Sequence, residues 1–164
     1  MRVLGLDVGD MRTGVAMSDP QGILATPVTV LASRDQNALI EEVLTLVRQH
    51  KVERVVVGLP RQLSGDLGKQ ANKVTAFADE LSAQAKRSKL DRLDVQLWDE
   101  RLSTKAAERL KTKAGGQGGS LRSRGKRGAR NRNLVIKAEV DAIAAAFILQ
   151  GFLDSQHPGN AEES

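Results

Sequence analysis

The sequence predicts an α/β fold in which helices flank a five-stranded mixed sheet. Two observations carry this prediction. Residues 3–8, 13–18 and 23–31 have the pattern of three strands joined by short turns, which is typical of an antiparallel meander. From residue 35 onward, helical and strand patterns alternate, and this order implies parallel strands joined by crossover helices.

Turn residues separate the strands of the meander. Residues 9–12 (Gly-Asp-Met-Arg) form a hairpin connection, and residues 19–22 (Asp-Pro-Gln-Gly) form a strong turn. In the second half, Ser33 or Asp35 is available as an N-cap for the first helix. The elements predicted there are a helix over 35–49, strands over 53–59 and 93–98, and helices over 68–86, 104–110 and 134–153.

Composition narrows the possible chemistry. The chain has 164 residues and is 40% hydrophobic, which suits one domain, predicted over 1–153 with a polar tail over 154–164. It has no cysteine, which excludes disulfides, thiolate zinc sites and cysteine nucleophiles. It has only two histidines, so any metal site would be oxygen-rich and suited to Mg²⁺ or Mn²⁺. Neither a signal peptide nor a long apolar run is found, so we expect a soluble, cytoplasmic protein without a membrane contact.

Positive charge is concentrated in one segment. Residues 111–132 hold eight Lys or Arg and no acid. The net charge of the whole chain is +5, so the net charge of the remaining residues is −3. We predict a basic loop over about 113–133 that binds a polyanion, most simply nucleic acid, although a solvated loop without a partner has the same composition. The segment lacks aromatic side chains, which favours contact with the backbone over base stacking. Its basic residues are Lys111, Lys113, Arg122, Arg124, Lys126, Arg127, Arg130 and Arg132.

Two carboxylates occupy positions where apolar residues are expected, and a third lies at a strand end, where acids are common. Asp7 lies near the end of a strand that should be central, where it either binds a cation or caps the following turn. Asp141 lies on an alanine-rich face of an apolar helix, and the alternative is an exposed carboxylate beside Lys137. Glu100 follows the fifth strand, and periodicity alone does not decide whether Glu100 or Asp99 faces the site.

Together these acids suggest metal-dependent chemistry. Two divalent ions about 3.5–4 Å apart activate water and stabilise the attacking and leaving oxygens during phosphodiester hydrolysis. Three carboxylates from separate elements are sufficient for Mg²⁺, which retains several waters. The sequence shows neither a Ser-His-acid set nor a Gly-x-x-x-x-Gly-Lys-Ser/Thr phosphate loop.

Several motifs over residues 2–153 resemble the YqgF/RuvX family, whose members are described as Holliday junction resolvases and as pre-16S rRNA processing nucleases. The motifs are Leu6-Asp7-Val8-Gly9 with Arg12 and Gly14, Gly58-Leu59-Pro60, Asp99-Glu100-Arg101-Leu102-Ser103-Thr104, and Val140-Asp141 before Ala144-Ala145.

The resemblance implies a ribonuclease H-like fold related to the RuvC resolvases, with catalytic metal on Asp7, Glu100 and Asp141. Many ribonuclease H relatives carry an acid on the fourth strand, where this chain has residues 58–60 (Gly-Leu-Pro). Glu100 would then replace that acid from the neighbouring strand.

Glycines and arginines near these motifs are candidates for substrate contact. Gly5, Gly9 and Gly14 leave room for a substrate near Asp7, although Gly9 and Gly14 also suit the hairpin. Arg12, Arg61 and Arg101 are candidates to bind phosphates together with the basic cluster.

Three function classes follow. The first is a metal-dependent nuclease for structured nucleic acid, acting in pre-16S rRNA 5′-end processing, Holliday junction resolution or both. The second is a non-catalytic ribosome-assembly factor with the same fold. The third, a sugar-kinase or actin-like ATPase, needs two lobes and a far longer chain. RNA or DNA substrate, the ribosome as a partner, and a monomer or homodimer all remain open.

Overall fold

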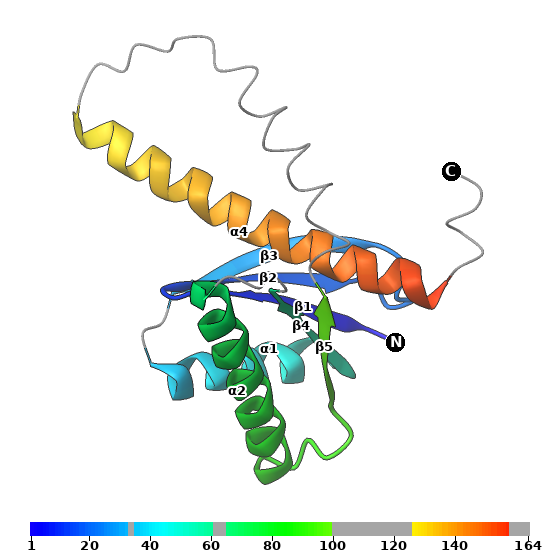
Figure 1. Cartoon of the computed structure of the whole chain (residues 1–164). Helices are drawn as coiled ribbons and strands as arrows, with labels where there is room; N and C mark the ends of the chain where they lie inside the picture. Colours follow the sequence, from blue (N-terminus) through cyan, green and yellow to red (C-terminus); the bar gives the residue numbers. More distant parts are fainter. Residues whose placement is uncertain (33–34, 61–64, 100–125, 158–164) are drawn as a thin grey trace.

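The computed structural model describes residues 1–32, 35–60, 65–99 and 126–157 of the chain. Its sheet has five strands in the order β3-β2-β1-β4-β5 (Figure 1). Pairs β1–β2 and β2–β3 are antiparallel, whereas β1–β4 and β4–β5 are parallel, which confirms the predicted mixed sheet. The strands are β1 (Val3–Val8), β2 (Arg12–Ser18), β3 (Ala25–Ala32), β4 (Arg54–Leu59) and β5 (Asp94–Asp99).

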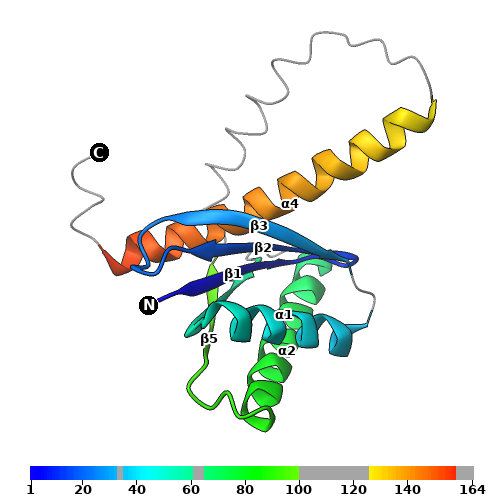
Figure 2. The ribbon, with the colours of Figure 1, turned by 180° about the vertical axis from the view of Figure 1, so that it is seen from behind.

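Helices cover both faces of the sheet. Helices α1 (Gln36–His50) and α2 (Gly65–Arg87) lie on one face, and α4 (Lys126–Gln156) lies on the other (Figures 1 and 2). Each face has its own core, because alternate residues of a strand point to opposite sides. Leu4 and Leu6 of β1 pack toward α1 and α2, whereas Val3 packs toward α4. Gly5 and Asp7 therefore share the α4 face with Val3.

The central strands are the most deeply buried. Val55, Val56 and Val57 of β4 are completely buried, as expected for a continuous apolar run between two helical layers. Val56 joins the core under α4, and its two neighbours join the core under α1 and α2.

The turn before β3 explains why this strand begins two residues later than predicted. The main-chain N–H groups of Ile23 and Leu24 donate to the Asp19 carboxylate, at 2.7 and 2.9 Å, instead of entering the sheet. These two bonds lower the pKa of Asp19 because they stabilise its charged form. The strand pattern therefore starts at Ala25.

Helix α1 settles the choice between two predicted N-caps. Asp35 is the N-cap, and its side chain accepts a hydrogen bond of 3.1 Å from the main-chain N–H of Asn37. Ser33 lies outside the described residues. The helix ends at Lys51, a C-cap in the left-handed conformation with φ of 53°.

Helix α4 corrects two predictions. It begins at Lys126, eight residues before the predicted start, so the end of the basic segment is helical rather than a loop. Lys, Arg and Ala have high helix propensity and make up five of the eight added residues, which outweighs Gly128 and the two asparagines. Val140 and Ile143 are 37% and 38% exposed, so part of the apolar surface of this helix faces solvent. The predicted helix over 104–110 lies outside the described residues.

No helix in the described part of the chain combines the length and the apolar character needed to span a membrane.

Candidate functional site

Asp7 is positioned by the most central strand of the sheet. It lies one residue before the end of β1, on the α4 face, and is partly buried. Its antiparallel partner across the sheet is Gly14 of β2. Asp7 is therefore held on rigid backbone at the edge of the core, and its side chain has interactions within the molecule.

Asp141 reaches the same place from α4. A Cβ atom added to Gly14 would overlap the main-chain carbonyl of Asp141, so the helix backbone rests directly on this glycine. Gly14 thus adjoins both acids, Asp7 in the neighbouring strand and Asp141 in the helix above. Two acids separated by 134 positions in the sequence therefore adjoin the same glycine.

Arg12 contributes a positive charge to this site. Its Nε lies 3.6 Å from Oδ2 of Asp141, and the two side chains are 32% and 34% exposed. Arg12 shares the α4 face with Gly14, two residues along β2. Both the carboxylate and the guanidinium are thus within reach of a molecule in solution.

The glycines serve packing rather than substrate access. A Cβ at Gly5 would lie 2.7 Å from Cβ of Leu149, and one at Gly9 would lie 2.7 Å from the carbonyl oxygen of Arg12. Helix α4 occupies the space over Gly5 and Gly14. The prediction that these three glycines leave room for a substrate is therefore wrong, because the protein itself fills that space.

Asp99, at the end of β5, lies on the opposite face of the sheet from the two acids. Trp98 lies on the α4 face, where its ring meets Phe152 edge-on with centroids 5.6 Å apart. Val95 packs on the opposite face, and alternation assigns Asp99 to that face as well. Asp99 is thus not on the face that holds Asp7 and Asp141.

Other predicted site residues divide into two groups. Outside the described residues lie Glu100, Arg61, Arg101, Arg122 and Arg124. The first two turns of α4 contain Lys126, Arg127, Arg130 and Arg132.

Sequence reasoning missed two residues that support the site. The side-chain amide of Gln70 donates to the carbonyl oxygen of Val8 at 3.1 Å, and Lys73 Nζ lies 3.0 Å from Oδ1 of Asp10. Both contacts tie α2 to the β1–β2 hairpin that carries Asp7 and Arg12. No local signal indicates them, because both residues lie among the polar positions of an amphipathic helix.

The donor set suits a hard divalent cation. Asp7 and Asp141 supply carboxylate oxygens, the ligands that Mg²⁺ and Mn²⁺ prefer. The described residues contain no group of three acidic, histidine or cysteine side chains that would hold a metal by itself. These two acids therefore fit part of a metal site that needs a further ligand.

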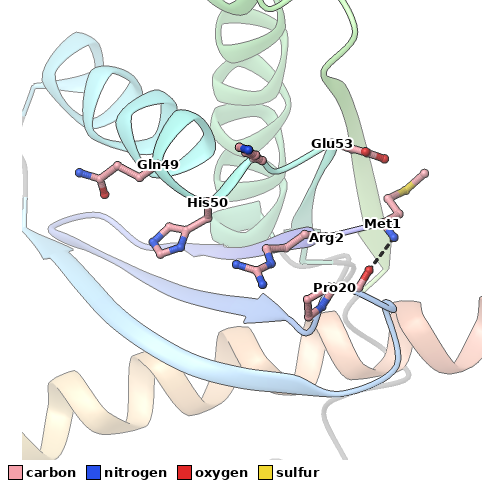
Figure 3. Close-up of a pocket in the computed structure, with 7 residues that line it drawn as sticks. Met1, Arg2, Pro20, Gln49, His50 and Glu53 are labelled. Atoms are coloured by element: carbon pink, nitrogen blue, oxygen red, sulfur yellow. Dashed lines mark hydrogen bonds between the residues drawn. The ribbon is translucent and has the colours of Figure 1, made fainter.

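The cleft shown in Figure 3 lies elsewhere. It has a volume of about 410 Å³ and is lined by Arg2, Gln49, His50 and others at the start of β1 and the end of α1. That is the opposite end of β1 from Asp7. The two carboxylates thus lie outside this cleft.

Comparison with known proteins gives the family. The RuvX family, described as Holliday junction resolvase, matches residues 1–155. The chain belongs to the RuvX family. It is therefore a nuclease, an enzyme that hydrolyses phosphodiester bonds in nucleic acid, and neither a non-catalytic assembly factor nor an ATPase is favoured. Divalent-metal dependence is general for nucleases with this resolvase-like fold.

Two relatives illustrate the similarity to curated members. A protein of Desulforamulus reducens is 40% identical over 159 residues, covering 94% of this chain and 98% of that protein. A protein of Clostridium tetani is 41% identical over 155 residues, covering 94% of this chain and 97% of that protein. Both are named "Putative pre-16S rRNA nuclease".

Solved structures support the fold. Thermus thermophilus RuvC in complex with a Holliday junction has a TM-score of 0.53 and 16% identity, covering 96% of each chain. The yeast mitochondrial Holliday junction resolvase Ydc2 has a TM-score of 0.51 and 13% identity, covering 92% of this chain and 77% of that one. The predicted ribonuclease H-like fold is thereby confirmed.

Proposed function

We propose that this RuvX-family nuclease cleaves structured RNA in the processing of the 5′ end of pre-16S rRNA. The observation that carries the proposal is the meeting of Asp7 and Asp141 at Gly14, on a partly exposed face. Relatives about 40% identical over nearly their whole length bear the rRNA nuclease name. The junction-binding structures are only 13–16% identical and inform the fold alone. This substrate also implies action in the cytoplasm, with the ribosome as a partner.

Holliday junction resolution is the second candidate, because the family description names it. A resolvase that makes paired symmetric cuts is expected to act as a homodimer, whereas an RNA-processing enzyme can act as a monomer. The two candidates therefore differ in substrate and in assembly.

We assign the metal ligands to Asp7, Glu100 and Asp141. Alternation along β5 leaves Asp99 on the α1 and α2 face, away from the face of Asp7 and Asp141. Glu100 is therefore the acid we assign to the site. When bound, Mg²⁺ or Mn²⁺ supplies activation of water and stabilisation of the charge that develops on the phosphate oxygens.

The chain's own residues bind and orient the substrate. Arg12 lies beside the carboxylate of Asp141, and we assign to it, and to Arg61 and Arg101, the binding of backbone phosphates. We assign contact with the nucleic-acid backbone to the basic segment as well. The hairpin contacts of Gln70 and Lys73 hold Asp7 and Arg12 in place.

The first prediction concerns metal and substrate. We expect cleavage of a pre-16S rRNA fragment in Mg²⁺ or Mn²⁺, and loss of cleavage in excess EDTA. A four-way DNA junction at the same concentration should be cut more slowly. Undiminished cleavage in EDTA would contradict the metal mechanism. Faster cutting of the junction would identify branched DNA, rather than RNA, as the substrate. Sedimentation of the active enzyme then separates monomer from dimer.

The second prediction concerns the basic segment. Replacing Arg124, Lys126, Arg127 and Arg130 by Gln should weaken RNA binding and reduce the slope of log K against log salt. The expected reduction is about 0.7–0.9 for each phosphate that the variant no longer neutralises. The measurement is a titration in EDTA at several salt concentrations.

The matched control for the basic segment removes four charges at the other end of the sheet: Arg48, Lys86, Arg87 and Arg92. The control should leave the salt slope close to that of the wild type. Equal slopes in both quadruple variants would show that the basic segment does not contact the substrate.

A further inference from the structure

We propose that Arg12 competes with the divalent metal for Asp141, and that nucleic acid relieves this competition by drawing the guanidinium to a backbone phosphate. The inference rests on the proposed function, since it takes Asp141 as a metal ligand. It adds a coupling between metal binding and substrate binding that is built into one ion pair.

The ion pair is loosely held. Its distance of 3.6 Å exceeds hydrogen-bonding length, whereas Arg54–Asp94 and Arg87–Glu80 lie at 2.8 and 2.9 Å. Arg54 is also fixed over the ring of Phe152, 5.6 Å from its centroid. The Arg12 side chain makes no such second contact with the described residues and is 32% exposed. Its guanidinium can therefore leave the Asp141 carboxylate for a phosphate at a small cost in free energy.

The backbone of Arg12 is fixed, so the exchange involves only its side chain. Its carbonyl oxygen accepts a 2.9 Å hydrogen bond from the N–H of Gly9, which closes the hairpin. Arg12 also pairs with Ala32 in the sheet. The Lys73–Asp10 contact anchors the same hairpin to α2. The guanidinium thus moves about a stationary Cα beside Asp141.

Electrostatics sets the direction of the effect. A guanidinium next to Asp141 neutralises the carboxylate and repels a cation that approaches the same oxygens. Because the site is partly exposed, this repulsion is screened, and we expect it to weaken metal binding by about 3- to 10-fold at low salt. A phosphate offers the guanidinium a charge-assisted, bidentate contact and so leaves Asp141 available to the metal.

The test measures Mn²⁺ binding by the full-length protein, using the loss of the free-ion signal in electron paramagnetic resonance. Arg12→Ala should bind Mn²⁺ about 3- to 10-fold more tightly than the wild type. Arg12→Lys keeps the charge and should bind Mn²⁺ with nearly wild-type affinity. The control, Arg48→Ala, removes an exposed arginine from α1 on the other face of the sheet and should change nothing.

A second measurement follows binding of the pre-16S rRNA fragment in EDTA, where no cleavage occurs. Arg12→Ala should bind the RNA about 3- to 10-fold more weakly, with Arg48→Ala unchanged. Opposite shifts in metal and RNA affinity support the inference. Unchanged or weaker Mn²⁺ binding by Arg12→Ala overturns it, as does unchanged RNA binding.

One more variant separates failure of the inference from failure of the proposed function. Asp141→Asn should lose Mn²⁺ affinity if Asp141 is a metal ligand. If that variant binds Mn²⁺ as the wild type does, the assigned metal site is wrong and the inference falls with it. If Asp141→Asn loses affinity and Arg12→Ala does not gain it, only the inference is overturned.

Discussion

Asp7→Asn is expected to reduce phosphodiester cleavage by at least about 100-fold while RNA binding persists. The substitution keeps the shape of the side chain but removes the negative charge that a divalent cation requires. Asp7 lies on a central strand at the edge of the core, so the neutral amide can remain in place. The measurement is single-turnover cleavage of the pre-16S rRNA fragment in Mn²⁺, with binding measured in EDTA.

The control for Asp7 is Asp79→Asn, which neutralises an exposed acid of α2. Asp79 lies outside the elements that carry Asp7 and Asp141, so the loss of its surface charge should change cleavage by less than about threefold. In the same assay, Glu100→Gln should behave as Asp7→Asn does, and Asp99→Asn should keep most activity. Wild-type cleavage by Asp7→Asn would refute the assigned active site.

Gly14→Ala is expected to destabilise the protein by at least about 1–3 kcal/mol, the usual cost of overpacking a core. The added Cβ would overlap the main-chain carbonyl of Asp141, and backbone cannot rotate away as a side chain can. Helix α4 would have to move off β2, and Asp141 would move with it. Urea unfolding measures the loss of stability, and the cleavage assay should show reduced activity even in the folded fraction.

Gly68→Ala provides the matched control for Gly14. Gly68 lies near the start of α2, is exposed, and has no atom within 4 Å of the position of an added Cβ. The same substitution should there stabilise the protein by about 0.5–1 kcal/mol, since alanine favours a helix over glycine. A Gly14→Ala protein as stable as the wild type would show that α4 does not pack on β2 as described.

The local order of apolar and polar residues was sufficient to predict most of the strands and helices. The apolar run of β1, which opens the meander, and the valine run of β4 correctly indicated strands buried on both faces, because such burial leaves a direct mark on residue order. The start of α4 was missed because its first turns are polar and carry no apolar stripe. The late start of β3 was missed because a side chain, Asp19, takes the main-chain donors of Ile23 and Leu24.

For the candidate site as well, some features are visible in the sequence and others only in the structure. The sequence by itself determined that Asp7 and Asp141 are the candidate acids, since a carboxylate within an apolar pattern is visible without coordinates. Only the tertiary structure decided that Gly14 receives the backbone of α4, that Arg12 pairs with Asp141, and that Asp99 turns away from the site. The first two facts depend on how a helix near the end of the chain packs on a hairpin near its beginning, and the third on which face of β5 each core covers. Periodicity reports which face of an element is buried, but not which distant residue covers it.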